Sequence, residues 1–413
     1  MSVTMNKPQT EQDAAGVQQT TCCVVGAGPA GAVLALLLAR AGVAVTLLEL
    51  HKDFDRDFRG DTLHPSVMEI MDQLGLAERL LALPHSKLRS LNFMGDTGAG
   101  LQVDFGSLKT KFPYITMLPQ VRFLEVVTAE AARYPHFQLH MDANVQELIE
   151  EGGAVRGVRY RDGAGRTHEL RALLTVGADG RSSRVRRLSG MEPVKSAPPM
   201  DVLWFRLPRL AADGAGVSGR FLRGHIIILL DRDTEWQIGY VIPKGSYQQL
   251  RAKGLDELRQ NVAAAVPALA DRVEHLKDWK QVAMLSVESS CLTRWYKPGL
   301  LLIGDAAHVM SPVAGVGINY AIQDAVVAAN VLAGPLKAGA VSVRELRTVQ
   351  RRRRWPVRVI QKFQALIQQR LVAPALDAAA QPVGPPAFLR WPLLRRLVAR
   401  VVAFGVRRVR VES

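Results

Sequence analysis

Hydrophobic positions near the start of the chain predict a strand, a helix and a second strand in close succession. An uncharged run over Cys22–Ala39 has the composition of a membrane span. Glycines and a proline interrupt this run, and a basic residue closes it. These breaks favour a short strand over Cys22–Val25, a tight turn and a helix over residues 30–40. The next strand is expected over Val43–Leu48, so the segment is a β-α-β unit.

Farther along the chain, segments with helical periodicity alternate with segments of strand periodicity. The stretch over residues 203–243 is rich in β-branched and aromatic residues separated by turn residues, which predicts antiparallel sheet. After Ser342 the pattern is helical and basic, and prolines are expected to break it at positions 356, 374, 382, 385, 386 and 392. Other expected elements are helices over 66–74, 120–132 and 315–332, and strands over 138–141, 154–160 and 300–303.

Composition changes this picture little, because it is that of an ordinary globular protein. Of the 413 residues, 48% are hydrophobic and 22% are charged, which excludes a disordered or collagen-like chain. Cys22, Cys23 and Cys291 have neither the number of a disulfide framework nor zinc-finger spacing. A reducing, cytoplasmic setting is therefore expected. No metal site is predicted, since no cluster of His, Cys and Asp has ligand spacing.

The net charge of +15 is concentrated in the last 70 residues. From Arg344 onward there are 16 basic and three acidic residues, whereas the preceding 343 residues contain 37 basic and 35 acidic ones. Three interpretations remain open. The basic positions can form a solvated or packed helix face. Residues 388–404, where apolar and basic positions alternate, can instead form an interfacial helix on a membrane or a hydrophobic partner. Nucleic acid is not expected as a partner, because aromatic residues are sparse and no nucleic-acid-binding fold is indicated.

The first motif with candidate chemistry is the glycine-rich segment Gly26–Gly31, which is followed by Glu49. Glycines at this spacing allow a tight turn, a close approach to a pyrophosphate and close packing of helix on strand. The helix N-terminus offers N–H groups to phosphates, and the acid can accept ribose hydroxyls. A second match to the glycine pattern, over Gly214–Gly219, follows a polar loop and precedes a strand. The first copy therefore predicts the dinucleotide site, and the second is interpreted as a loop.

Two further motifs follow. In Gly177–Arg184 a hydrophobic strand leads into a Gly-Ala-Asp-Gly turn and a basic helix start, which can also be a structural turn with an Asp cap. In Gly304–His308 a strand ends in Asp305, whose carboxylate can bind a sugar or ribityl hydroxyl. The Pro/Gly segment Pro312–Asn319 then opens an apolar helix, whose N-terminus directs its positive end at an anionic group. A buried β-α connection would not explain the clustered small residues.

In this order the three motifs resemble those of the single-component flavoprotein aromatic hydroxylases, the family of 4-hydroxybenzoate hydroxylase. Pro312–Asn319 also resembles the ubiquinone-biosynthesis hydroxylases. The resemblance covers about residues 20–330. It implies an α/β (α+β) fold, with a Rossmann-like FAD-binding domain interleaved with an antiparallel-sheet substrate domain. The implied boundaries are a flexible leader (1–20), the FAD-binding domain (21–195 and 285–341), the substrate sheet (196–284) and a basic helical region (342–413).

The resemblance also implies the chemistry. FAD would be bound non-covalently, and NAD(P)H would be a transient co-substrate. Reduced flavin would react with O₂ to give a C4a-hydroperoxide that hydroxylates an aromatic or polycyclic small molecule. The implied sites are the pyrophosphate cradle (Gly26, Gly28, Ala30, Gly31), the adenosine ribose site (Glu49), the surroundings of the cofactor (Arg59, Gln120), the motif for both FAD and NAD(P)H (Asp179), the ribityl site (Asp305), the flavin N1–O2 edge (Gly317, Ile318, Asn319) and the reaction chamber (Pro312).

The catalytic group and the substrate are less defined by the sequence. A phenol usually needs a base or a polar relay. Candidates in the β-rich segment are Arg206, His225 and Tyr240, although ordinary sheet structure is the favoured interpretation of each. The benzoate-binding residues of 4-hydroxybenzoate hydroxylase have no counterpart here, so a neutral, apolar or polycyclic aromatic is preferred.

Alternatives within the same fold are a flavin dehydrogenase or reductase and a halogenase. The halogenase Trp-x-Trp-x-Ile-Pro signature is matched here only by Ile242-Pro243. A non-catalytic nucleotide-binding module is the alternative of a different class. The protein is expected to be a monomer or homodimer.

Overall fold

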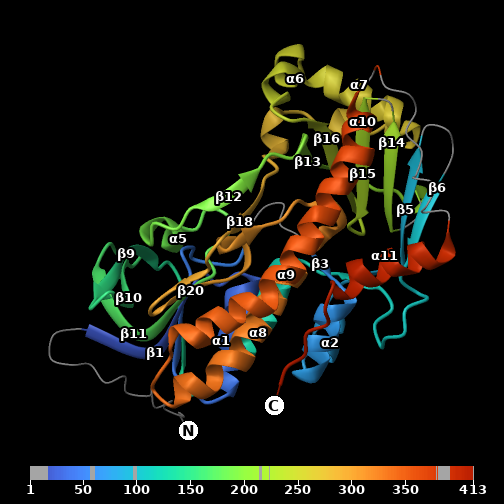
Figure 1. Cartoon of the computed structure of the whole chain (residues 1–413). Coiled ribbons are helices and arrows are strands. Elements are labelled where there is room, and N and C mark those ends of the chain that lie inside the picture. Colours follow the sequence, from blue (N-terminus) through green and yellow to red (C-terminus); the bar gives the residue numbers. More distant parts are fainter. Residues whose placement is uncertain are drawn as a thin grey trace, which may run out of the picture.

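The computed structural model describes residues 17–55, 61–95, 100–213, 216–222, 224–377, 379 and 391–412 (Figure 1). Its largest sheet is built around a parallel core. Strand β1 (Val17–Val25) lies between β11 (Thr167–Gly177) and β2 (Val45–Leu48), in the order β19-β20-β11-β1-β2-β8. The remaining strands of this sheet are β8 (Phe137–His140), β9 (Asn144–Glu151), β10 (Ala154–Arg161), β19 (Tyr296–Lys297) and β20 (Leu300–Leu302).

The parallel pairing places the sequence motifs together. Val25, at the end of β1, lies opposite Gly177 of β11 and Leu48 of β2, and Gly177 lies opposite Leu302 of β20. The carboxyl ends of parallel strands meet at one edge of a sheet, which is where such folds bind ligands. All three motifs and Glu49 follow directly from these four strand ends.

Strand β1 begins earlier than the sequence predicts. Residues 17–20 pair with residues 169–172 of β11, because that long strand continues past the core and offers a further row of partners. The expected leader over residues 1–20 is therefore too long at its carboxyl end.

Two apolar helices cover the parallel strands. Helix α1 (Pro29–Arg40) is buried at every position from Ala30 to Ala39, and it packs against α8 (Gly317–Lys337). With the turn before it, the segment Val313–Lys337 is long and apolar enough to cross a bilayer, and 72% of its most apolar window is buried inside the protein. The other helices of this part are α2 (Pro65–Gln73), α3 (Ala77–Leu81), α4 (Gln120–Ala131) and α5 (Arg184–Leu188).

A second, seven-stranded sheet has the order β17-β13-β16-β15-β14-β5-β6 and is mostly antiparallel. Its strands are β5 (Ser90–Gly95), β6 (Gly100–Asp104), β13 (Met200–Pro208), β14 (Val217–Leu222), β15 (His225–Asp231), β16 (Glu235–Pro243) and β17 (Ala283–Leu285). One face packs against α7 (Leu255–Ala265), beside α6 (Tyr247–Lys253). Because β5 and β6 come from the N-terminal part of the chain, this sheet is interleaved with the first one.

Two small sheets connect these parts. One contains β3 (Thr62–Leu63), β4 (Ser86–Leu88) and β7 (Ile115–Met117), and the other contains β12 (Pro193–Ser196), β18 (Ser289–Leu292) and β21 (His308–Val309).

The basic C-terminal region is built into the body of the protein. Helix α9 (Val343–Ile367) runs from α8 toward the second sheet (Figure 1) and continues through Pro356, contrary to the predicted break. It leads into a π-helical turn, η7 (Gln368–Val372), and α10 (Ala373–Leu376), which contacts β15 and β16. Packing on both sheets outweighs the hydrogen bond that the proline cannot donate. The last helix is α11 (Pro392–Phe404), which lies against β6 and α2.

Candidate functional site

A continuous cavity of about 1620 Å³ lies between the carboxyl edge of the first sheet and one face of the second. Drug-sized ligand pockets usually measure about 300–1,000 Å³. The volume therefore has room for a dinucleotide and a second, smaller molecule. The three sequence motifs line one end, and the β-strands of the second sheet line the other.

The glycine-rich turn is shaped for a close ligand. Gly26 has φ +98°, and a Cβ there would lie 2.7 Å from the Ala178 carbonyl oxygen. A Cβ on Gly31 would lie only 1.9 Å from the Gly26 carbonyl oxygen, so this glycine serves helix–strand packing. Gly28 has nothing within 4 Å of its Cβ position, and no side chain caps α1. The first N–H groups of α1 therefore face an open cradle that fits a pyrophosphate.

Glu49 stands at the tip of β2 and is 7% exposed. Its Oε2 accepts a hydrogen bond from the Ala27 N–H at 2.9 Å, and its Oε1 accepts one from the His51 N–H at 3.1 Å. These contacts hold the carboxylate beside the glycine turn, where it lines the cavity. This is the place that the sequence assigns to a ribose-binding acid.

Asp179 lines the cavity, but its carboxylate is used within the chain. It accepts hydrogen bonds from the Ser183 hydroxyl at 2.5 Å, the Arg184 N–H at 2.7 Å and the Val185 N–H at 3.0 Å. The aspartate thus caps α5, which is the structural interpretation that the sequence left open.

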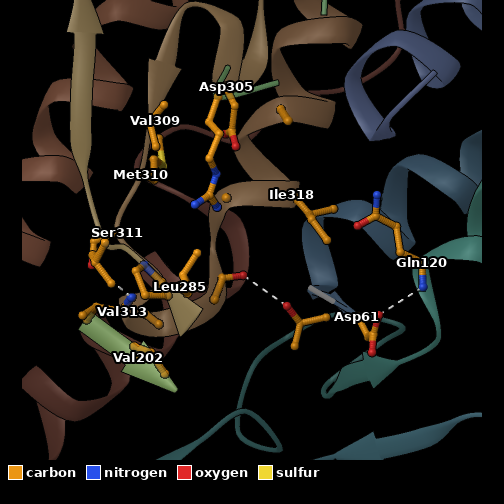
Figure 2. Close-up of a pocket in the computed structure, with 18 of the residues that line it drawn as sticks. Asp61, Gln120, Val202, Leu285, Asp305, Val309, Met310, Ser311, Val313 and Ile318 are labelled. Atoms are coloured by element: carbon orange, nitrogen blue, oxygen red, sulfur yellow. Dashed lines mark hydrogen bonds between the residues drawn. The ribbon is translucent and has the colours of Figure 1, made fainter. Parts of the chain in front are cut away.

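A buried hydrogen-bond and charge network around Asp324 supports the third motif. Asp324 in α8 accepts hydrogen bonds from the Gly304 N–H at 3.0 Å, from His308 Nε2 at 2.6 Å and from Arg353 Nε at 2.6 Å. Burial alone would raise the pKa of Asp324, but the positive charges of His308 and Arg353 outweigh it and hold the pKa below its usual range. The network fixes the turn that presents Asp305 to the cavity (Figure 2).

The start of α8 contributes backbone groups and one side chain. Gly317 and Ile318 line the cavity, whereas Asn319 is buried and accepts a hydrogen bond from the His64 N–H on its Oδ1 at 3.0 Å. The Asn319 side chain therefore connects α8 to the start of α2. The sequence predicts that it faces the flavin, but it does not line the cavity. Pro312 lines the cavity on the same side.

Gln120 and Asp61 lie together across the pocket from Val202 and Leu285 (Figure 2). The Gln120 N–H donates to Asp61 Oδ1 at 3.1 Å, and both side chains line the cavity. Arg59 lies outside the described residues.

The second sheet does not place the three predicted catalytic residues in the cavity. His225 Nδ1 and the Tyr240 hydroxyl share a hydrogen bond of 2.8 Å, and Tyr240 packs on the α7 side of the sheet. Burial raises the pKa of Tyr240 and lowers the pKa of His225. Arg206 is exposed and pairs with Glu235 at 3.4 Å. Successive strand residues point to opposite faces, so His225 and Tyr240 lie on the face away from the cavity. Arg206 has the same alternation as Trp204 and pairs in register with Gln237, but it lies beyond the residues that line the cavity. None of the three predicted positions is therefore brought into the cavity.

The cavity face of this sheet is formed by the alternate residues. Apolar side chains dominate it, namely Met200, Val202, Trp204, Ile226, Ile228, Leu230 and Val241. Three polar residues that the sequence reasoning missed also line the cavity: Arg232 and Gln237 at the end of this sheet, and Asp61 just before β3. The available signals were the aspartate two positions after Arg59 and the arginine at the hairpin turn after β15.

Together these features are typical of a nucleotide-binding protein with a large, mostly apolar chamber beside the nucleotide site. The family described as FAD binding domain matches residues 19–362. The chain is 35% identical over 400 residues to a 6-methylpretetramide 4-monooxygenase from Streptomyces rimosus, covering 95% of this chain and 94% of the relative. The chain belongs to this family of FAD-dependent monooxygenases, which confirms the predicted family, fold class and cofactor.

Two further likenesses are consistent with this assignment. A 12-dehydrotetracycline 5-monooxygenase/anhydrotetracycline 6-monooxygenase from Streptomyces rimosus is 29% identical over 314 residues, covering 73% of this chain and 60% of that relative. The crystal structure of PqsL from P. aeruginosa, in complex with 2-aminobenzoylacetate, superimposes with a TM-score of 0.75 at 20% identity, covering 86% of this chain and 97% of the other. The latter likeness shows the fold alone.

The residues present fit FAD. The open cradle at Gly28 suits the pyrophosphate, and the acid at the tip of β2 suits a ribose. Asp305 and the start of α8 lie along the same cavity wall.

Proposed function

We propose that the protein inserts one oxygen atom from O₂ into a polycyclic aromatic compound, with NAD(P)H as electron donor. The observation that carries the proposal is the single cavity, which joins the cofactor cradle to an apolar sheet face without a dividing wall. The relative whose sequence is 94% covered by the match is named a 6-methylpretetramide 4-monooxygenase. A wide apolar chamber suits a fused-ring substrate better than a small benzoate.

Each end of the cavity has a separate task in this proposal. Gly26, Gly28, Ala30 and Gly31 bind the pyrophosphate, Glu49 a ribose and Asp305 the ribityl chain. Bound FAD supplies the oxygen-transfer chemistry once it is reduced. The positive N-terminus of α8, at Gly317 and Ile318, stabilises negative charge on the adjacent ring.

The substrate end excludes water and orients the ring system. Val202, Trp204 and Val241 form an apolar wall opposite the cofactor side. Water exclusion protects a reactive oxygen donor from loss. Pro312, which also lines the cavity, limits how the substrate approaches in this proposal.

A turnover experiment tests this function. Purified yellow protein is supplied with NADH or NADPH and with 1-hydroxyanthraquinone, anthracene or 4-hydroxybenzoate. We expect substrate-stimulated oxidation of the nicotinamide and a product heavier by one oxygen with the fused-ring phenol. Oxidation that no aromatic stimulates, or a halogenated product in chloride or bromide buffer, would contradict the proposal. An Asp305→Ala variant should lose most of its flavin on purification.

We also propose that the outer face of α11 contacts an anionic lipid surface. Its inner residues, among them Val402 and Phe404, are buried, so the helix stays docked on the protein. Trp391, Leu393 and Leu397 remain 68%, 78% and 55% exposed beside basic residues. Such a mixture of aromatic, aliphatic and basic side chains is typical of interfacial helices.

Flotation with vesicles containing phosphatidylserine tests this contact. The wild type should float with the vesicles, and a Leu393→Ser/Leu397→Ser double variant should not. Equal flotation of both proteins would contradict the contact. Oligomeric state and cytoplasmic location stay predictions.

A further inference from the structure

A polar cluster interrupts the otherwise apolar substrate end of the cavity. Arg232 begins the hairpin turn between β15 and β16, where its N–H donates to the Glu235 carbonyl oxygen at 2.9 Å. Asp233 takes the left-handed conformation in this turn, with φ +69°, which Asp tolerates better than most residues. The tight turn leaves the Arg232 side chain at the cavity wall together with Gln237.

The cluster joins the two parts of the protein. Arg232 Nε and Nη2 donate to Gln237 Oε1 at 2.9 and 2.8 Å. Arg232 Nη2 also lies 2.7 Å from Asp61 Oδ2, and Asp61 Oδ1 accepts from the Gln120 N–H. The ion pair is poorly hydrated, since each side chain is 18% exposed. Burial lowers the pKa of Arg232 and raises the pKa of Asp61, against the opposing effect of each partner's charge.

The cluster has more donors than acceptors. A guanidinium carries five N–H groups and cannot accept a hydrogen bond. Among the described residues, the structure shows no partner for Arg232 Nη1 or for the Gln237 side-chain NH₂. Both residues line the cavity, and neither group is among the buried unpaired atoms of the described residues, so a ligand in the cavity can reach them. A ligand that offers oxygen acceptors to these donors would complete the cluster.

The charge of the cluster limits which acceptor fits. Asp61 balances the charge of Arg232, and the more exposed Arg206, which acts on both groups, is paired with Glu235. The cluster therefore has no net charge for a bound anion to neutralise. A carboxylate placed here would face the Asp61 carboxylate at short range, which is repulsive in a poorly hydrated site. A carbonyl oxygen, or the neutral carbonyl–enol edge of a hydroxylated fused-ring ketone, avoids this repulsion.

We propose that Arg232 and Gln237 bind the carbonyl–hydroxyl edge of the substrate, and that Asp61 excludes carboxylated aromatics. This inference rests on the proposed function, because it assumes an aromatic molecule at the sheet end of the cavity. It gives the cavity a specificity-determining site at the end of the second sheet where Arg232 and Gln237 lie.

Ligand binding without turnover tests the proposal. FAD-loaded protein is titrated in the absence of NAD(P)H, and quenching of flavin fluorescence reports the Kd. The probes are three compounds that each contain three linearly fused six-membered rings: 1-hydroxyanthraquinone, anthracene and anthraquinone-2-carboxylate. Arg232→Met should weaken binding of 1-hydroxyanthraquinone about tenfold, since hydrogen bonds to a charged donor are lost, and leave anthracene unchanged. Arg220→Met is the control, because Arg220 lies on the opposite face of the same sheet, near the Ala265 carbonyl.

A second variant tests the role of the acid. Asp61→Asn keeps the side-chain shape and should tighten binding of anthraquinone-2-carboxylate about fivefold. If Arg232→Met does not retain flavin, Gln237→Leu removes the second donor and should weaken 1-hydroxyanthraquinone alone. Unchanged binding of 1-hydroxyanthraquinone by the donor variants overturns the proposal, even if the wild type oxygenates it. Donor-dependent binding without oxygen insertion would leave this site standing and would refute the proposed function.

Discussion

The two large sheets present their parts of the cavity in different ways. The first sheet contributes the ends of its parallel strands, where backbone turns at Gly26, Asp179 and Asp305 meet at one edge. The second sheet contributes one face, and only every second residue of a strand reaches the cavity. An edge site depends on where strands end, whereas a face site depends on which way each side chain points. The two sites should therefore fail in different ways when they are altered.

The edge site is most sensitive at a glycine. In a Gly31→Ala variant the new Cβ would lie 1.9 Å from the Gly26 carbonyl oxygen, so the backbone must move. We expect almost complete loss of folded, flavin-containing protein, measured as flavin per chain and by circular dichroism. Gly28→Ala is the matched control, because its Cβ enters open space. It should fold and bind FAD more weakly, and equal flavin content in both variants would refute this account of the turn.

The support beneath the edge site is the next most sensitive. Arg353→Met would leave Asp324 buried without its guanidinium partner. Breaking a buried ion pair costs about 3–5 kcal/mol, and urea unfolding should show a loss of that size. The control is Arg352→Met. Arg352 is 42% exposed, and its Nη1 lies 3.7 Å from Glu412 Oε1, which is a long, exposed ion pair. Its loss should change the free energy of unfolding by less than about 0.5 kcal/mol. Similar losses in the two variants would contradict the network.

A smaller, pH-dependent effect is expected where α2, α8 and α11 meet. His64 is buried, donates from Nδ1 to the Val402 carbonyl oxygen at 2.8 Å, and has its pKa lowered by burial from 6.5 to about 4. Between these values the unfolded chain binds a proton that the folded chain does not. Stability contributed by neutral His64 is thus lost as the pH falls, by about 2.5 kcal/mol between pH 7 and pH 4.5.

A His64→Gln variant checks this effect. Between pH 7 and pH 4.5, the variant should lose about 2.5 kcal/mol less unfolding free energy than the wild type, as measured by urea unfolding. Parallel pH profiles for the two proteins would show that His64 is not the titrating group.

The smallest effects should separate the two faces of the second sheet. Tyr240→Phe removes the hydrogen bond to His225 on the α7 side and should cost about 1 kcal/mol of stability. Its kcat/KM should change less than about twofold, because the Tyr240 side chain packs on the α7 side and does not line the cavity. Trp204→Leu alters the cavity face and should raise KM with little change in flavin content. A large fall in kcat for Tyr240→Phe would restore it as a catalytic candidate.

The same contrast explains what the sequence could predict. Glycines and acids at fixed spacing mark strand ends, and the structure brings Glu49, Asp305 and the glycine turn to one edge of the cavity. Strands β13, β15 and β16 are apolar on both faces, since one packs on α7 and the other lines the cavity. Alternation therefore gives no sign of which face is which.

Arg206 shows how close such a prediction can come. It pairs in register with Gln237 across β13 and β16, yet its guanidinium turns outward to Glu235. The arginine that lines the second sheet's end of the cavity is Arg232. It lies in a hairpin turn, and the geometry of that turn cannot be read from the amino-acid composition. Likewise, charge alone could not distinguish the buried Arg353 from its exposed neighbour.

The central claim is that the two sheets enclose one chamber in which oxygen from O₂ is transferred to an aromatic ring. Turnover of 1-hydroxyanthraquinone under isotopically heavy O₂, with mass spectrometry of the product, tests it most directly. The account predicts one heavy oxygen atom in each product molecule, and none when heavy water replaces heavy O₂. A product labelled from water, or oxidation of NAD(P)H that yields only hydrogen peroxide with every fused-ring phenol tried, would contradict it.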